Sequence, residues 1–386
     1  MIEEAHIKKN LKQFAFPRLS GTEYEGKAYK KLTNELENMN LKYKVQPFTF
    51  SSFYSRIYPK VAFSSVSIIL LISYFNIYMP ILMILMILLF SMLIISIVLT
   101  RKPEKIKFIT KMDSQNVLIR IKSLTKENKV NDRIILFISH LDSKGQRFTI
   151  RIRIRIIKLG ITSAIILLVT IISKNLILIE FKLVFYIIGL FPLILTILSS
   201  IMMLLNTTDN SSDGAVDNAS GIACNLELLN YYCIPENRLS NYNIWFLFTG
   251  AEECGTMGIR HFYNNLVNLN PKKSIIFNFE SIAKHVYLFP GENEGDHAKD
   301  VDNLILKNNR NLAIPHFTTK RVFGTHSDGG YLGDRGFQGF GIGEVEAYTY
   351  MHTPNDTIDK INTELLEKLC LVITDALGEH DSNFFK

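Results

Sequence analysis

The chain alternates between mixed stretches, in which apolar and polar residues share each short window, and long runs that are almost purely apolar. The longest run, residues 61–100, contains no charged residue. Asn76 and Pro80 mark a turn inside it. Because about 20 apolar residues are needed to cross the hydrocarbon core of a bilayer, this run predicts a transmembrane hairpin with helices at about 61–78 and 80–100.

A second pair of apolar runs covers 159–173 and 183–205. Its first member is short for a span, so it needs help from its flanks or enters the bilayer only partway. Just before it, the stretch RFTIRIRIRIIK alternates arginine with isoleucine. That alternation fits either a strand with one basic face or a segment at lipid headgroups. We expect a second transmembrane hairpin here and no nucleic-acid partner.

Basic residues flank both hairpins on one side. The flanking cations are Arg56, Lys60, Arg101, Lys102, Lys105, Lys107, Arg147, Arg151, Arg153, Arg155 and Lys158, against Lys174 and Lys182 in the opposite turns. An excess of lysine and arginine marks the cytoplasmic side of a membrane protein. We therefore expect a multi-pass integral membrane protein whose polar parts face the cytoplasm. The net charge of +7 then reflects the hairpin flanks.

The remaining pieces, 1–55, 106–158 and 206–386, show strand and helix patterns in alternation. Continuous apolar runs such as IILFIS, IWFLF and SIIFNF are typical of buried central strands. The last such piece ends in NTELLEKLCLVITDAL, which predicts an amphipathic helix. We predict an α/β domain with a largely parallel central sheet covered by helices on both faces. Two hairpin segments, 56–105 and 159–205, interrupt it.

Side chains that can bind metal gather where the predicted strands end. They are His140 and Asp142 after one strand, Glu252 and Glu253 after a second, Glu280 after a third, Asp217 in a turn before a helix, and His352 in a late loop. Ligands of α/β sheets collect at the carboxyl ends of the strands. A set of histidines and carboxylates without cysteine suits zinc or another divalent metal. The four cysteines show no metal-binding spacing, and we expect free thiols.

Five motifs, in this order, resemble peptidase family M28, the zinc aminopeptidases with an α/β fold and a two-metal site. SHLDS resembles the family's His-x-Asp motif, DGAVDNASG its bridging-aspartate turn, and TGAEECGTMG its paired-glutamate motif. FNFES resembles its acidic strand end and YMHTPNDT its final histidine, while FPRLSGTEYEGKAYKKL resembles its first helix. The resemblance covers nearly the whole chain outside the hairpins.

The resemblance implies two zinc ions, or other divalent metals, and a ligand for each matching position. His140 and Glu280 would bind the first ion, and Glu253 and His352 the second. Asp217 would bridge both ions. Glu280 departs mildly from the family, in which aspartate is common at this position.

The resemblance also implies the roles of the remaining residues. Glu252 would be the general base that takes a proton from the attacking water and passes it to the leaving amine. Asp142 would orient His140. The peptide bond between Asp217 and Asn218 is expected to be cis, as is common in the family.

A glycine-rich stretch near residue 330 matches a family loop that often begins with Ser-Asp. There Asp328 and His326 would contact the substrate or support the site, and a purely structural loop is the alternative. The expected activity is that of a membrane-anchored, metal-dependent aminopeptidase that removes N-terminal residues from peptides. Two alternatives remain: a glutaminyl cyclase-like zinc acyltransferase, and a non-catalytic binding protein on a peptidase fold. The complete set of ligands and base favours the peptidase.

Overall fold

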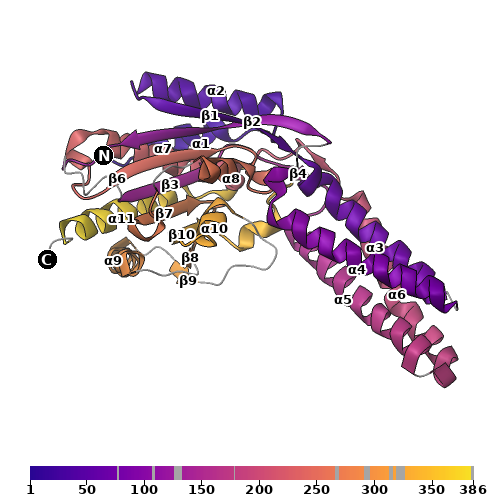
Figure 1. Cartoon of the computed structure of the whole chain (residues 1–386). Coiled ribbons are helices and arrows are strands. Elements are labelled where there is room, and N and C mark those ends of the chain that lie inside the picture. The colour runs from indigo at the N-terminus through magenta and orange to yellow at the C-terminus, as the bar shows by residue number, and fades with distance from the viewer. Residues whose placement is uncertain are drawn as a thin grey trace. The chain divides into compact units, whose positions relative to one another are not determined.

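Two compact units make up the computed structural model of this chain (Figure 1). Unit 1 comprises Met1–Phe50, Met112–Gly145 and Asp209–Lys386, and unit 2 comprises Ser51–Lys111 and Gln146–Thr208. The structure describes residues 1–75, 78–106, 109–125, 133–177, 179–265, 269–290, 296–312, 316–318 and 327–383.

An eight-stranded sheet forms the centre of unit 1, with its strands in the order β1–β2–β6–β3–β7–β10–β8–β9. Their bounds are β1 Tyr43–Ser51, β2 Lys111–Ile121, β3 Ile134–His140, β6 Asn243–Thr249, β7 Ser274–Phe279, β8 Val286–Pro290, β9 His316–Thr318 and β10 Gln338–Gly343. A separate two-stranded sheet pairs β4 (Gly145–Gln146) with β5 (Thr208–Asp209).

The sheet is mixed, with a parallel centre. Strand β3 pairs in parallel with β6 and with β7, and β7 pairs in parallel with β10. Beyond this centre, β2 runs antiparallel to β6, and β8 runs antiparallel to β10. The predicted largely parallel sheet is therefore correct for the four central strands, while the strands that flank them make the sheet mixed.

Helices cover both faces of this sheet. Those of unit 1 are α1 Glu4–Phe14, α2 Glu23–Asn38, α7 Ser220–Cys233, α8 Met257–Asn264, α9 Asp296–Leu312, α10 Asp328–Gly333 and α11 Thr363–Ser382. Successive side chains of a strand point to opposite faces. Ile135 and Phe137 of β3 accordingly join the core formed with α1, α2, α7, α9 and α11. Ile134, Leu136 and Ile138 join a second core with α8 and α10.

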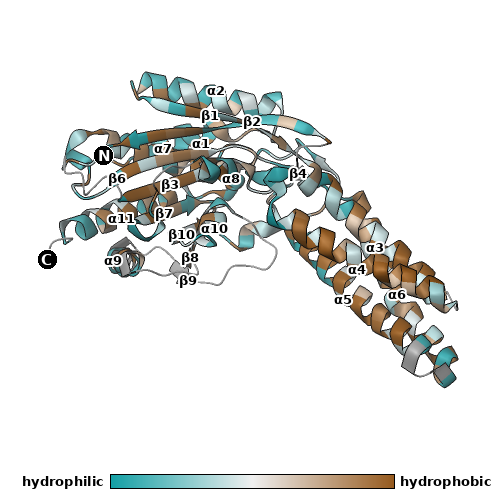
Figure 2. Ribbon diagram, in the orientation of Figure 1, coloured by the Kyte–Doolittle hydropathy of each residue, from teal (hydrophilic) through white to brown (hydrophobic). Residues whose placement is uncertain are grey.

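Four long apolar helices form unit 2: α3 Tyr58–Phe75, α4 Met79–Arg101, α5 Ile150–Ile172 and α6 Lys182–Leu205. Among the described residues, these four are long and apolar enough to span a bilayer, by length and composition alone. Figure 2 shows the hydrophobic colouring that runs along all of them.

Unit 2 exposes apolar side chains and buries hydroxyl groups. Ile87 and Phe90 of α4 are 63% and 66% exposed. In contrast, the buried polar side chains of its helices include Ser67, Ser73, Ser163, Thr170, Thr196, Ser199 and Ser200. The hydroxyls of Ser67 and Ser200 lie 2.5 Å apart and join α3 to α6. Small residues and hydroxyls between helices, with large apolar side chains outside, are typical of helices packed in lipid.

Helix α5 begins at Ile150, nine residues before the predicted span at 159, and continues without a break through the basic stretch. The hydroxyl of Thr149 caps it by accepting a hydrogen bond from the amide of Ile152. The strand interpretation of this stretch is therefore wrong. Helical geometry places Arg151 and Arg155 one turn apart, and both are exposed. With 23 residues, α5 has the length of a full candidate span.

Candidate metal centre

The carboxyl ends of the central strands bring the predicted ligands together. His140 is the last residue of β3, Glu253 follows β6, and Glu280 follows β7. Asp217 lies in the turn that leads into α7, and His352 lies in the loop between β10 and α11. Because β6, β3 and β7 are parallel neighbours, their ends meet at one edge of the sheet.

Two groups of three ligand atoms form there and share Asp217. In the first group, His140 Nε2 lies 3.1 Å from Asp217 Oδ1 and 3.5 Å from Glu280 Oε2. In the second, His352 Nε2 lies 3.0 Å from Asp217 Oδ2 and 2.8 Å from Glu253 Oε1. The two oxygens of Asp217 thus face different groups, as a carboxylate between two ions requires.

The residues of both groups fit divalent metal ions. Within the described part of the chain, His140 Nε2 and Glu253 Oε1 are buried and, although other ligand atoms lie 2.8–3.5 Å away, neither atom makes a well-directed hydrogen bond. An unpaired buried polar atom is costly unless a ligand satisfies it. The donor atoms are imidazole nitrogen and carboxylate oxygen, a set that zinc and similar divalent ions accept. A cation at each group would satisfy these atoms and neutralise the gathered carboxylates.

Asp142 organises this centre in two ways. Its main-chain carbonyl lies 3.0 Å from His140 Nδ1, which directs the Nε2 atom toward Asp217. Its carboxylate lies 3.5 Å from the same ring nitrogen and accepts the amides of Glu252 and Glu253, at 3.1 and 3.0 Å. The side chain of Asp142 therefore holds the paired-glutamate turn, while its carbonyl holds the histidine ring.

Glu25 of α2 also stabilises the turn that carries Glu252 and Glu253. The carboxylate of Glu25 accepts the amide of Ala251, the amide of Gly21 and the hydroxyl of Ser114. Ala251 has a φ of 51°, a left-handed conformation that is uncommon for a residue with a side chain. Burial, with the charge of Asp142 adding to it, raises the pKa of Glu25 to about 8.

The neighbouring glutamates have opposite electrostatic environments. Burial raises the pKa of Glu252 well above its ordinary value, and the charge of Glu280 adds to the effect. Burial alone would raise the pKa of Glu253 as well, but the charges of His352 and Lys144 outweigh it and hold that pKa at about 2. Glu252 is thus suited to taking up a proton, whereas the ionised Glu253 is suited to binding a cation.

Asp356 fixes the turn that carries the shared aspartate. Its carboxylate accepts the amides of Val216 and Asp217, at 2.6 and 3.3 Å. The bond between Asp217 and Asn218 is cis, as expected from the sequence. The side chain of Asn218 donates to the carbonyl of Phe279 at the end of β7. These contacts connect the shared ligand to the loops and strands that bring the other ligands.

Of the two residues expected to contact substrate, Asp328 lies at this centre and His326 lies outside the described residues. Asp328 is 1% exposed, and its carboxylate accepts a hydrogen bond from Thr249 at the end of β6. Burial raises the pKa of Asp328 to about 7, and the charge of Glu280 contributes. This enclosure fits a residue that supports the neighbouring groups, and a contact of Asp328 with substrate stays a prediction.

Sequence reasoning missed several residues that hold the centre, namely Arg18, Ser20, Glu25, Lys144 and Asp356. Arg18 donates to the carbonyls of residues 141, 213 and 214, which lie in the segments around the ligands. Ser20 donates to the carboxylate of Asp142. Glu25 stands three residues after Thr22, a spacing that indicates an ordinary helix cap. Nothing in that spacing points to the distant partner Ala251.

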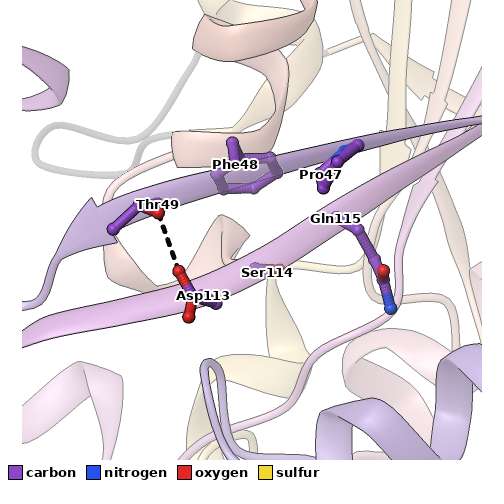
Figure 3. A pocket seen from close by; sticks show the side chains of 6 residues that line it. All are labelled: Pro47, Phe48, Thr49, Asp113, Ser114 and Gln115. Carbon is purple, nitrogen blue, oxygen red and sulfur yellow. Dashed lines mark hydrogen bonds between the residues drawn. The ribbon is translucent and has the colours of Figure 1, made fainter.

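A separate depression of about 320 Å³ lies between β1 and β2 (Figure 3). It is lined by Pro47, Phe48, Thr49, Asp113, Ser114 and Gln115. The hydroxyl of Thr49 donates to Asp113 across it, at 2.7 Å. None of these lining residues belongs to the two ligand groups, so this depression is distinct from the metal centre.

Comparison with known proteins gives one family and a set of similar folds. Residues 199–377 match the model of peptidase family M28. None of the curated protein sequences matches the chain. Among solved structures, the aminopeptidase from Aneurinibacillus sp. strain AM-1 has a TM-score of 0.57 at 15% identity, over 97% of this chain and 93% of that chain.

Two further structures show the range of activities on this fold. A zinc aminopeptidase, BSAP from Bacillus subtilis, has a TM-score of 0.57 at 14% identity, over 98% of this chain and 95% of that one. A glutaminyl cyclase from an Acidobacteriales bacterium has a TM-score of 0.56 at 13% identity, over 99% of this chain and 95% of that one. At such low identities the likeness concerns the fold, which zinc aminopeptidases and glutaminyl cyclases share.

Proposed function

We propose that this chain is a membrane-anchored, metal-dependent aminopeptidase. The observation that carries the proposal is the pair of ligand groups that share Asp217, with Glu252 beside them. The match of residues 199–377 to peptidase family M28 supports it. His140, Asp217 and Glu280 would hold one zinc or other divalent ion, and Asp217, Glu253 and His352 a second.

Two ions at such a centre lower the pKa of a water molecule and stabilise negative charge on the scissile carbonyl oxygen. The chain's own residues supply the rest of the chemistry. Glu252 takes the proton from the attacking water and delivers it to the leaving amine. Its buried setting suits this role, because a carboxylate that is disfavoured as an anion accepts a proton readily. The carboxylate of Asp142 accepts the amides of both glutamates and so fixes the position of Glu252 relative to Glu253.

The membrane part of the proposal rests on unit 2. Its four apolar helices, with exposed aliphatic side chains and buried hydroxyls, suit a lipid surrounding. Arg151, Arg155 and Lys158 lie on one exposed face of α5 at helical spacing. In a bilayer these cations would meet lipid phosphates, with unit 1 on the cytoplasmic side. Protease treatment of sealed vesicles tests this side, because a cytoplasmic unit 1 is digested only in inside-out vesicles.

A glutaminyl cyclase-like acyltransferase is the second candidate, because structures with that activity share the fold. The presence of two ligand groups, each of three residues with Asp217 in common, favours the two-ion peptidase. The remaining alternative, a non-catalytic binding protein, is disfavoured because ligands and base are all in place.

An assay with substrates whose amine is either free or acetylated distinguishes these functions. The purified full chain is offered amino-acid anilides, the same anilides with an acetylated amine, and a peptide with N-terminal glutamine. The proposal predicts hydrolysis of the free-amine anilides and loss of hydrolysis on acetylation. Cleavage that ignores acetylation would contradict an aminopeptidase, and cyclisation of the glutamine peptide without anilide hydrolysis would favour the acyltransferase.

A further inference from the structure

Lys144 places a positive charge on only one of the two ligand groups. Its ammonium nitrogen lies 2.7 Å from Glu253 Oε2 and 3.4 Å from the main-chain carbonyl of the same residue. The side chain of Lys144 is only 12% exposed, so solvent screens this contact weakly. Glu253 therefore has one oxygen on the lysine, while its other oxygen faces His352.

Among the described side chains, no lysine or arginine makes an ion pair with His140 or Glu280 of the other group, whose ion pairs are with ligand residues and Asp142. Buried Asp328 interacts electrostatically with Glu280 and His140, whereas Glu252 interacts with Glu280 and with Glu253 and so does not distinguish the groups. One oxygen of Glu280 accepts a hydrogen bond from Asn278, which carries no charge. The group of His140 and Glu280 thus differs from the group of Glu253 and His352 in having no ammonium partner in the part of the chain that the structure describes.

Two other charged groups near the shared aspartate do not offset this difference. Arg18 is buried, but its guanidinium donates to main-chain carbonyls and lies near Asp217, which belongs to both groups. Asp356 lies near His352, and the amides of Val216 and Asp217 occupy its carboxylate. Of the described residues, Lys144 is the cation that makes an ion pair with a ligand of one group and not of the other.

We infer that Lys144 makes the two ion sites unequal, so that the site of Glu253 and His352 is the weaker and fills only when divalent metal is plentiful. This inference rests on the proposed two-ion function and adds regulation of the site by metal supply. A cation close to a ligand carboxylate opposes a second cation through Coulomb repulsion. It also keeps Glu253 Oε2 engaged, which leaves Oε1 as the ligating atom.

Zinc binding to the full chain, stripped with a chelator in detergent, tests the inference without relying on activity. Zinc content is measured at equilibrium against a series of buffered free-zinc concentrations. The wild-type chain is expected to fill in two steps separated by at least about tenfold in free zinc. Lys144→Met should shift the second step to lower zinc by about 10- to 100-fold, with the first step little changed.

Matched variants test whether the effect comes from the charge of Lys144 and from its position beside Glu253. Lys144→Arg keeps the charge and should keep the two steps apart, whereas Lys307→Met removes an exposed lysine of an ordinary surface ion pair and should change neither step. Glu280→Gln should remove the tight step, and Glu253→Gln the weak one. A circular dichroism melt of each variant confirms that it remains folded.

Two results would overturn the inference. The first is wild-type binding of two ions in steps less than about threefold apart. The second is a Lys144→Met variant whose second step is unchanged or weaker, since that would make the lysine a positioning group for Glu253. If two equal ions bind and peptidase activity is present, only this inference fails. If no zinc binds to any form, the proposed function fails with it.

Discussion

The two units of this chain differ most in the side chains that they expose. In unit 1, aromatic and aliphatic residues such as Phe137 lie inside, stacked against Tyr232, Phe246 and Phe279. In unit 2, many large apolar side chains face outward, and buried serines and threonines lie between the helices beside aliphatic residues such as Leu70 and Leu167. The same physical rule explains both arrangements if water surrounds unit 1 and hydrocarbon surrounds unit 2.

The comparison also explains where the charged chemistry lies. Unit 1 can bury several carboxylates at one sheet edge because backbone amides, Arg18 and the expected cations compensate them. The four long helices of unit 2 carry their charged residues mainly toward their ends, where headgroups and water would be accessible if they span a bilayer. Three pairs of substitutions test the contrast, taken from the largest expected effect to the smallest.

The largest effect is expected from truncating an aromatic side chain. Phe137→Ala should lower the free energy of unfolding of unit 1 by about 3–5 kcal/mol, because it leaves a cavity among packed rings. Phe90→Ala, on the exposed face of α4, should change stability by no more than about 0.5 kcal/mol. Urea unfolding followed by the fluorescence of Trp245, the only tryptophan, measures unit 1. Thermal unfolding in lipid nanodiscs, followed by circular dichroism, compares the Phe90→Ala chain with the wild-type chain. Equal losses would contradict the contrast.

A lysine on an exposed apolar position should distinguish the two surroundings. Ile87→Lys should lower the fraction of chain that resists alkaline extraction from membranes, since a lysine near a helix centre costs about 2.5–3.5 kcal/mol in lipid. Leu124→Lys places the same charge on an exposed residue of unit 1 and should leave that fraction unchanged. The membrane assignment would be wrong if the Ile87→Lys chain were retained as well as its Leu124→Lys control.

The smallest effect is expected from a buried hydroxyl of unit 2. Ser200 bonds the hydroxyl of Ser67 and the carbonyl of Phe63, both on α3. Ser200→Ala should cost about 0.6 kcal/mol, a typical value for a hydrogen bond between helices in lipid. Ser96→Ala removes a hydroxyl that bonds only within α4, to Met92, and should cost less. Unfolding by a denaturing detergent compares the two variants. A larger loss of stability for Ser96→Ala would argue against a stabilising role for the hydroxyls buried between the helices.

The local sequence predicted the elements and residues whose signals are contiguous. The central strands, the apolar helices and the positions of His140, Glu253 and Glu280 at strand ends follow from runs of neighbouring residues. What the sequence missed depends on contacts between distant segments. The hydrogen bond from the amide of Ala251 to Glu25 joins residues 226 positions apart. The arginines before residue 159 recur at every second position, a pattern that resembles a strand more than the start of the helix that the structure has there.

Metal content and peptidase activity, measured together on the detergent-purified chain and its Glu252→Gln variant, test the central claim most directly. The account predicts two ions per chain in both proteins at saturating zinc. It also predicts anilide hydrolysis that falls by about 10²- to 10⁴-fold in the variant, because only the proton acceptor is lost. An absence of bound metal in the wild-type chain, or full activity in the variant, would contradict it.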